Sequence, residues 1–191
     1  MNTNTDQIYI DKVLQGDTNA FAYLVNRYKN MVFTLALNMV KCREDAEEIA
    51  QDSFLKAFQQ LHTFKGNSKY STWLYTIVYR NAISMLRKKK LKTFDINAEI
   101  IANYTTDIDF PQLESLKEED QKKYVKLILE SLPETDAFLI TLFYLDENSL
   151  DEIEEITGLS KSNIKVKLFR LRKRLYKELS LLLNEEIKEL L

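Results

Sequence analysis

The chain has 191 residues and a formal net charge of −2, with three Gly, two Pro, one Cys and one His. Such a length allows one domain or two small ones, and the single Cys and His exclude an internal disulfide and a His/Cys metal cluster. No apolar run is long enough to span a membrane, and the N-terminus lacks a signal pattern, so we expect a cytoplasmic protein without membrane insertion. Few Gly and Pro and no alternating β-branched run predict an all-α fold.

The first part of the chain predicts helices that pack around one core. Residues 8–14 are a short helical candidate. Apolar residues at helical spacing then predict a long helix over residues 21–41. Its stripe consists of Phe21, Leu24, Val25, Tyr28, Val32, Leu35, Ala36 and Met39.

Residues 44–61 predict the next helix, which has two different faces. Its expected buried face consists of Ala46, Ala50, Phe54, Ala57, Phe58 and Leu61. The other side carries Glu48, Gln51, Asp52 and Leu55, with Ile49 at the flank. Between Glu44 and Leu55 the sequence has five acids and no base. This acidic face is either simply solvated or a docking surface for a basic partner, and spacing alone leaves both open.

A polar loop and a basic helix follow. Residues 64–70 (FKGNSKY) indicate a loop, and Ser71 is the expected cap of the helix behind it. Leu74, Val78, Ala82, Met85 and Leu86 share the inward face, and Trp73, Ile77, Arg80, Ser84 and Arg87 lie roughly opposite. An aromatic ring and cations beside a polar loop suit single-stranded nucleic acid. Alternatively, Trp73 closes the core and Lys88 to Lys90 only satisfy the helix C-terminus; the basic run favours a phosphate partner.

Residues 93–120 predict a flexible acidic linker. From Asp95 to Asp120 there are eight acids and one base, with a Pro and no clear apolar stripe. Helix is expected to resume near Gln121, to stop at Pro133 and to restart over residues 137–145.

Residues 149–177 show a helix-turn-helix pattern. Ser149 and Glu152 form a capping-box sequence, Gly158 permits a tight turn, and Ser160 is a second cap candidate. The second helix has an apolar stripe of Ile164, Leu168, Leu171, Leu175 and Leu179. Residues 161–177 contain eight Lys or Arg and no acid, whereas residues 146–155 contain six acids and no base. A basic second helix after such a turn is typical of major-groove binding, with an ordinary helical hairpin as the alternative.

One residue counts against this motif. Glu154 stands where two closely packed helices favour a small side chain, so we expect it to point outward to solvent.

Two segments together resemble a known family. The run DAEEIAQDSFLKAFQQLHTFKGNSKYSTWLYTIVYRNAISMLRK resembles domain 2 of bacterial sigma factors of the sigma-70 family, in the extracytoplasmic-function group. The run LPETDAFLITLFYLDENSLDEIEEITGLSKSNIKVKLFRLRKRL resembles their domain 4. The resemblance implies two helical domains, residues 1–92 and 121–191, on either side of the linker 93–120. It also implies core RNA polymerase (the beta prime coiled coil and the beta flap), promoter DNA and an anti-sigma factor as partners.

The resemblance assigns roles to individual residues. Glu48, Gln51, Asp52 and Leu55 are the expected polymerase contacts. The expected minus-ten contacts are Asn67, Ser68, Lys69, Tyr70, Trp73, Thr76, Ile77, Arg80, Asn81 and Arg87. Family members often carry Asn where this chain has Arg80, so either Arg80 or Asn81 faces the DNA; helical phase favours Arg80.

For the minus-thirty-five element, the resemblance divides the second helix of the motif into two sets. The base-facing set is Lys165, Val166, Phe169 and Arg170. The phosphate-facing set is Ser160, Ser162, Asn163, Lys167, Lys173 and Arg174. Val166 stands where a small polar residue is common, which implies an altered base preference, such as contact with a thymine methyl.

The sequence shows no catalytic, metal or nucleotide motif, so we expect neither an active site nor a cofactor. The resemblance implies a promoter-specificity subunit that acts within RNA polymerase. The alternative is a stand-alone helix-turn-helix regulator of operators, which would need a dimer surface or an effector pocket and no exposed acidic face.

Overall fold

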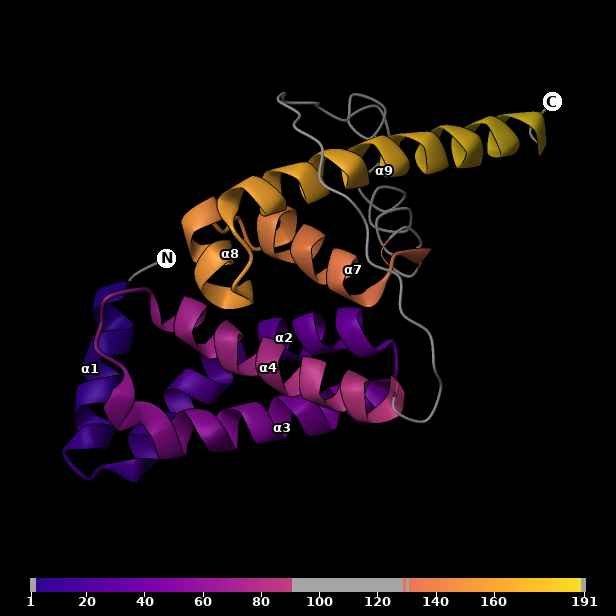
Figure 1. The fold of residues 1–191 in the computed structure, drawn as a ribbon. Coiled ribbons are helices and arrows are strands. Elements are labelled where there is room, and N and C mark those ends of the chain that lie inside the picture. The colour runs from indigo at the N-terminus through magenta and orange to yellow at the C-terminus, as the bar shows by residue number, and fades with distance from the viewer. Residues whose placement is uncertain (1–2, 91–128, 130, 190–191) are drawn as a thin grey trace.

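This computed structural model of the chain describes residues 3–90, 129 and 131–189. These residues form helices and contain no strand, which confirms the predicted all-α fold. Figure 1 shows two groups of helices, one formed by α1 to α4 and the other by α7 to α9. The predicted linker and the helix expected near Gln121 lie outside the described residues.

The first group is built around one long amphipathic helix. Its elements are α1 (Thr3–Leu14), the 3₁₀ turn η1 (Thr18–Ala20), α2 (Phe21–Val40), α3 (Arg43–Gln60), the 3₁₀ turn η2 (Leu61–Thr63) and α4 (Tyr70–Lys90). The predicted stripe of α2 is buried except for Val25, which is half-buried. Helix α2 ends at Lys41, which adopts a left-handed conformation with φ of 55°. The predicted apolar periodicity therefore does mark the core of this group.

Two local predictions for this group are wrong. Ile49, expected at a flank of α3, is buried, whereas Phe58, expected inside, is partly exposed and packs edge-on against Phe21. Helix α4 begins at Tyr70, so Ser71 lies inside its first turn and does not cap it. Both errors are small rotations or shifts that helical periodicity does not resolve.

The second group begins after Pro133, which precedes α7. Its elements are α7 (Glu134–Ile140), the π-helical turn η3 (Thr141–Leu145), α8 (Leu150–Thr157) and α9 (Lys161–Glu189). The predicted capping box is present, because Ser149 and Glu152 exchange hydrogen bonds at the start of α8. Gly158 ends α8 in the left-handed region with φ of 73°, where a Cβ would be strained. Ser160 then accepts a hydrogen bond from the Asn163 amide and caps α9, as predicted.

The two groups pack directly on each other. Helix α7 lies against α2, and α8 lies against α4 (Figure 1). The ring of Tyr79 stacks on Phe138 with a centroid separation of 5.0 Å. The amide of Asn38 donates to the hydroxyl of Thr141 at 2.8 Å across the same interface. One apolar core therefore runs through both groups.

A buried carboxylate near this interface makes the stability pH-dependent. One oxygen of Asp146, Oδ2, is buried without a hydrogen-bond partner in the described part of the chain. Burial raises its pKa from 3.8 to about 6. The folded form then holds this proton more tightly than the unfolded chain, so the contribution of Asp146 to stability decreases as the pH rises through this interval.

Asp146→Asn is expected to remove that pH dependence, because the amide carries no charge at any of these pH values. Above pH 6 the variant should have a higher unfolding temperature than the wild type, and the two should converge as the pH falls toward 4. Thermal unfolding followed by circular dichroism at several pH values measures this. Glu147→Gln, at the exposed neighbouring residue, is the control and should keep the wild-type slope.

Candidate nucleic-acid interface

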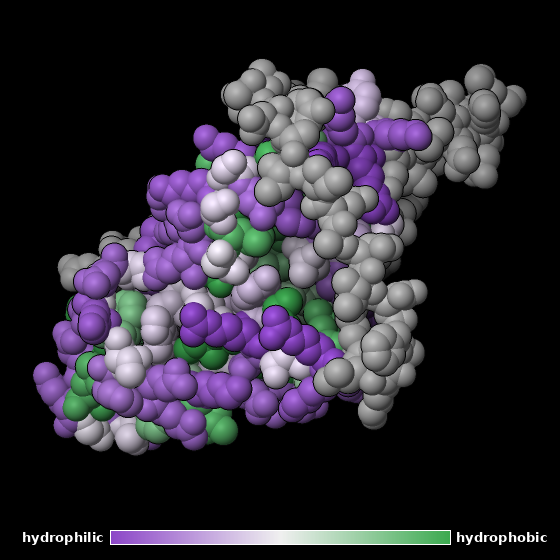
Figure 2. All heavy atoms as spheres, viewed as in Figure 1, coloured by the Kyte–Doolittle hydropathy of each residue, from purple (hydrophilic) through white to green (hydrophobic). Residues whose placement is uncertain are grey.

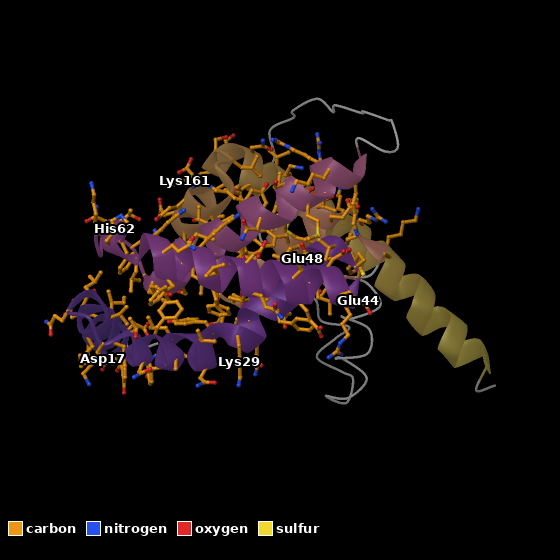
Figure 3. All side chains as sticks on the ribbon, turned by 90° about the horizontal axis from the view of Figure 1, so that it is seen from below. Asp17, Lys29, Glu44, Glu48, His62 and Lys161 are labelled. Atoms are coloured by element: carbon orange, nitrogen blue, oxygen red, sulfur yellow. The ribbon has the colours of Figure 1, made fainter. Side chains whose placement is uncertain are left out.

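The acidic face of α3 is defined here as Glu48, Gln51, Asp52 and Leu55. These four side chains are all exposed, and Leu55 exposes 56% of its surface. Their spacing of three and four residues aligns them along one side of the helix. Glu48 appears on α3 in Figure 3, whereas Lys161 is seen at the start of α9, in a different part of the molecule.

Basic residues of α4 border this face. Lys89 forms an ion pair with Asp45, and its hydrogen bond holds the pKa of the Asp45 carboxyl below its ordinary value. Lys56 and Lys88 line the groove of about 300 Å³ between α3 and α4, together with Glu48 and Asp52. The acidic face is thus accessible from solvent, with cations only along its edge.

A partly buried polar network holds Asn81 against α3. The Asn81 amide donates to Ser53 at 2.9 Å and accepts from Lys56 at 2.5 Å. Ser53 is fully buried and donates to the carbonyl of Ile49. Asn81 therefore faces α3, whereas Arg80 is exposed. Arg80 lies with Arg87 and Lys88 along a groove of about 480 Å³ on α4.

The loop before α4 is held by the first helix of the helix-turn-helix. Gly66 adopts φ of 71°, and Asn67 beside it is exposed. The hydroxyl of Ser68 donates to Glu155 at 2.8 Å, and the Lys69 ammonium forms an ion pair with Glu152 at 2.8 Å. Partial burial opposes ionisation of Glu152, but hydrogen bonds from Lys69 and Ser149 outweigh it and lower its pKa.

An aromatic cluster supports the other end of this loop. Tyr70 is buried and lies against Tyr28, Phe64 and Trp73 with ring centroids 5.5 to 5.7 Å apart. Trp73 is half-buried and also contacts Phe64. In this arrangement Tyr70 packs in the core, contrary to its expected place at the surface. Trp73 was expected either to close the core or to stack on nucleic acid. Its ring packs on Phe64 and Tyr70, and part of the side chain stays accessible to solvent.

Two further α4 residues differ from their expected placement. Ile77 exposes only 8% of its surface, so it belongs to the core and not to the outer face. Thr76 is half-buried, and its hydroxyl donates to the carbonyl of Thr72 at 3.0 Å. The residues of α4 that remain exposed on the expected face are Arg80, Ser84 and Arg87. Figure 2 shows mainly hydrophilic residues on the visible face, with smaller hydrophobic patches between them.

Glu154 takes part in the turn before α9. Its carboxylate accepts a hydrogen bond from the Lys161 amide at 3.2 Å, and the side chain is half-buried. The carboxylate is thus turned toward the exposed turn, and it also has a hydrogen-bonding role that the sequence did not indicate. Because the first amides of a helix lack intrahelical acceptors, Glu154 stabilises the N-terminus of α9 and orients it against α8.

The candidate residues of α9 fall into exposed and partly covered groups. The exposed ones are Ser160, Ser162, Lys165, Arg170, Lys173 and Arg174. The half-buried ones are Asn163, Lys167 and Phe169. The Lys173 ammonium lies 5.3 Å from the centroid of the Phe169 ring, and Lys167 pairs with Asp136 at 3.7 Å. Of the predicted stripe, Ile164, Leu168, Leu171 and Leu175 are buried, and Leu179 lies outside the described side chains.

Val166 differs from its expected base-facing role in this arrangement. It exposes only 5% of its surface, although it does not belong to the contiguous apolar core. Side chains two positions apart on an α-helix point about 200° apart around its axis. Val166 is two positions from both Ile164 and Leu168, so it lies on the opposite side of α9. Its burial is therefore not part of the helix-turn-helix core.

Sequence reasoning missed a second row of packed residues on α4, of which Tyr79 stacks on Phe138 of the second group. Thr72, Tyr75 and Tyr79 lie three and four residues apart on α4, and the first two are fully buried. The pair of Tyr residues at positions i and i+4 was the available signal for a second apolar stripe on this helix. The acids Glu152 and Glu155, which bind the loop, showed only as an acidic run.

Within the described part of the chain, no helix is both long and apolar enough to cross a membrane. The described side chains also contain no group of three or more His, Cys, Asp or Glu arranged to hold a metal ion.

Comparison with known proteins identifies the family. The model of sigma-70 region 2 matches residues 24–92, and that of sigma-70 region 4 matches residues 122–175. The ECF RNA polymerase sigma-E factor of Haemophilus influenzae is 35% identical over 175 residues, which cover 88% of this chain and 92% of the relative. The ECF RNA polymerase sigma factor SigW of Bacillus subtilis is 33% identical over 181 residues, covering 89% and 94%.

Solved structures share the fold. CnrH, in complex with the cytosolic domain of CnrY, superposes with a TM-score of 0.62 at 18% identity, covering 92% of this chain and 97% of the other. RpoE of Bartonella quintana, in complex with the anti-sigma factor NepR, gives a TM-score of 0.61 at 22% identity, covering 84% and 96%. Taken with the family matches and the sequence relatives, the chain belongs to the extracytoplasmic-function group of the sigma-70 family and is an RNA polymerase sigma factor.

Proposed function

We propose that this sigma factor binds the beta prime coiled coil of core RNA polymerase through the acidic face of α3. The observation that carries this proposal is the exposure of all four residues of that face, with Leu55 as an exposed aliphatic side chain among polar ones. Charge complementarity with a basic partner favours fast and specific association. The second domain is proposed to contact the beta flap.

Reading of the minus-ten element is assigned to the loop before α4 and to α4 itself. Asn67, Ser68 and Lys69 supply polar donors, Trp73 supplies a ring for stacking, and Arg80 and Arg87 supply cations on the same helix. Extruding a base from the duplex costs a few kcal/mol, so a surface that stabilises unstacked bases is required for opening. The network that turns Asn81 toward α3 supports Arg80 as the residue facing the DNA.

Reading of the minus-thirty-five element is assigned to α9, as the second helix of the helix-turn-helix. Its exposed Lys165 and Arg170 are proposed to contact base edges, and Lys173 and Arg174 to contact phosphates. About half or more of the hydrogen bonds between proteins and DNA go to the phosphates and sugars, and these contacts position the protein without reading the sequence.

Several wider features complete the proposal. The domains are residues 1–92 and 121–191, with residues 93–120 as the linker. The chain acts in the cytoplasm, has no catalytic activity of its own, and is regulated by an anti-sigma factor. The related fold of RpoE, which was solved with the anti-sigma factor NepR, supports the last point. Sigma factors as a family are non-enzymatic initiation factors.

Asp52→Ala and Gln51→Ala are expected to weaken association with core RNA polymerase by roughly tenfold each, which corresponds to about 1.4 kcal/mol. Both side chains are exposed, so their removal should leave helicity unchanged. Binding of fluorescently labelled variants to purified core polymerase measures the effect.

Asp17→Ala is the matched control for this experiment. Asp17 is an exposed acid beside η1, makes no side-chain capping hydrogen bond and lies away from α3 (Figure 3). Unchanged affinity in both α3 variants would contradict the docking assignment. Gel filtration of the wild type that gave only a free dimer, with no polymerase complex, would favour a stand-alone regulator.

A further inference from the structure

Helix α1 is joined to α2 by a buried carboxylate. Asp6 exposes only 5% of its surface, and its Oδ2 accepts a hydrogen bond from the Tyr28 hydroxyl at 2.6 Å. The other oxygen, Oδ1, pairs with the Arg27 guanidinium at 3.2 Å. Burial of a carboxylate is costly unless such partners compensate it, so these two interactions fix α1 on α2.

Tyr28 connects this carboxylate to the loop before α4. Burial and the hydrogen bond to Asp6 raise the pKa of the Tyr28 hydroxyl, so it stays protonated and remains a donor. The ring of Tyr28 lies 5.5 Å from that of Tyr70, at the end of the loop. Tyr70 in turn meets Phe64, at the start of the loop, edge-on with centroids 5.7 Å apart. The two ends of the loop are therefore joined through rings that pack on Tyr28.

Helix α1 also lies close to the middle of the loop. It packs beside η2, the 3₁₀ turn that leads into the loop (Figure 1). The side-chain oxygen of Gln7 is 3.9 Å from the position that a Cβ on Gly66 would occupy. The next residue is Asn67, which is exposed. The loop thus rests on α1 immediately before the residue that it presents to solvent.

A loop that holds an extruded base binds it better when the loop is ordered beforehand. Fixing a flexible backbone costs conformational entropy, and a loop that is already held in place does not lose that entropy on binding. Asp6 and Tyr28 are both buried, so they affect the DNA through the loop and not by direct contact.

We propose that Asp6 and Tyr28 are positioning residues for reading of the minus-ten element. Their hydrogen bond fixes the ring contacts that join Phe64 to Tyr70, and thereby fixes the place from which Asn67 meets the extruded base. This inference rests on the proposed function of the loop, and it adds α1 to the elements on which promoter opening depends.

Tyr28→Phe tests this proposal, because it removes the hydroxyl and keeps the ring. The template is a promoter recovered by sequencing the transcripts that appear on overexpression. The holoenzyme with this variant is expected to open the promoter about tenfold more slowly than the wild type, because a hydrogen bond to a charged group is lost. Its affinity for core polymerase should not change, since neither residue belongs to the acidic face of α3.

Asp6→Asn is the second variant. The amide oxygen still accepts from Tyr28, but a neutral acceptor binds more weakly than a carboxylate, so opening should slow by a smaller factor. Circular dichroism verifies that both variants fold. Wild-type opening rates for both would overturn the proposal.

Tyr75→Phe is the matched control. It also removes one hydroxyl from a fully buried ring, whose partner is the Met31 sulfur of α2 at 3.2 Å and not a residue of the loop. This variant should open the promoter at the wild-type rate. Equal slowing by Tyr28→Phe and Tyr75→Phe would indicate general destabilisation and would overturn the positioning role.

Combination with Asn67→Ala distinguishes positioning from a purely structural role. If Tyr28 acts through the loop, Tyr28→Phe with Asn67→Ala should slow opening by less than the product of the two single effects, since a displaced loop has already lost the Asn67 contact. Single effects that simply multiply would overturn the inference and leave the proposed function intact. Wild-type opening by Asn67→Ala would mean that the loop does not hold the base, which overturns its proposed function and the inference with it.

Discussion

Arg80→Ala and Asn67→Ala are expected to slow promoter opening by about 10- to 100-fold, with a much smaller effect on binding of the closed duplex. Losing the contact that holds one unstacked base costs about 1–3 kcal/mol. Each 1.4 kcal/mol corresponds to about a tenfold change in an equilibrium or rate constant. Both side chains are exposed, Asn67 in the loop before α4 and Arg80 on α4 itself. Abortive transcription from a paired template, compared with a template whose minus-ten bases are already unpaired, measures the effect.

The premelted template separates melting from recognition. It should partly rescue a variant that fails to melt DNA, and it should not rescue a variant that has lost base contacts. Asn81→Ala is the companion variant, because Asn81 is bonded to Ser53 and Lys56 of α3 and turned from the outer face. Wild-type opening rates for both Arg80→Ala and Asn67→Ala would show that the loop is only structural and that Trp73 is only a core residue.

Arg170→Ala is expected to lose about 1–3 kcal/mol on its preferred minus-thirty-five element and to relax the preference at one base pair, if its contact is bidentate. The side chain is exposed on α9, on the part of the helix beyond its capped N-terminus. Electrophoretic mobility shifts of the holoenzyme on a set of singly substituted duplexes measure both the loss and the change in preference.

Lys167→Ala should behave differently, because a phosphate contact carries no sequence information. The variant is expected to bind all duplexes more weakly, by a similar factor. The slope of log affinity against log salt concentration should decrease by about one, the contribution of one phosphate contact. Lys167 also pairs with Asp136 at 3.7 Å, so Asp136→Asn controls for the loss of that pair. Identical behaviour of the Arg170 and Lys167 variants would mean that α9 is rotated about its axis relative to the proposed docking.

The local structure of this protein follows closely from its sequence. The stripe of α2, the Ser149–Glu152 capping box, the left-handed Gly158 and the Ser160 cap all depend on residues within one or two helical turns of each other. Such short-range patterns specify where helices begin and end and which face is apolar. The resemblance of two segments, in order, also predicted the family that the comparisons confirm.

The candidate site was predicted less completely, because helical phase gives the direction of a side chain but not what covers it. Tyr70, Ile77 and Val166 were all expected at a reading surface, and all three are buried. Glu154 was expected to point outward, and its exposed carboxylate also binds the first backbone amide of α9, which the sequence did not indicate. For Tyr70 and Glu154 the partners are distant in the sequence or approach across a turn: Tyr28 lies against Tyr70, and Lys161 donates to Glu154.

The sequence by itself determined the all-α fold, the helix-turn-helix and the separation of acidic and basic segments, since these depend on local periodicity, capping and composition. Only the tertiary structure decided that α8 lies on α4 and that Glu152 and Glu155 bind Lys69 and Ser68. Helix α4 carries one apolar stripe for its own domain, and its Tyr79 also packs on Phe138 of the other. A single sequence does not show whether such a stripe is buried or exposed. Its burial depends on contacts between residues about 60 to 100 positions apart, and these contacts form only when the whole chain folds.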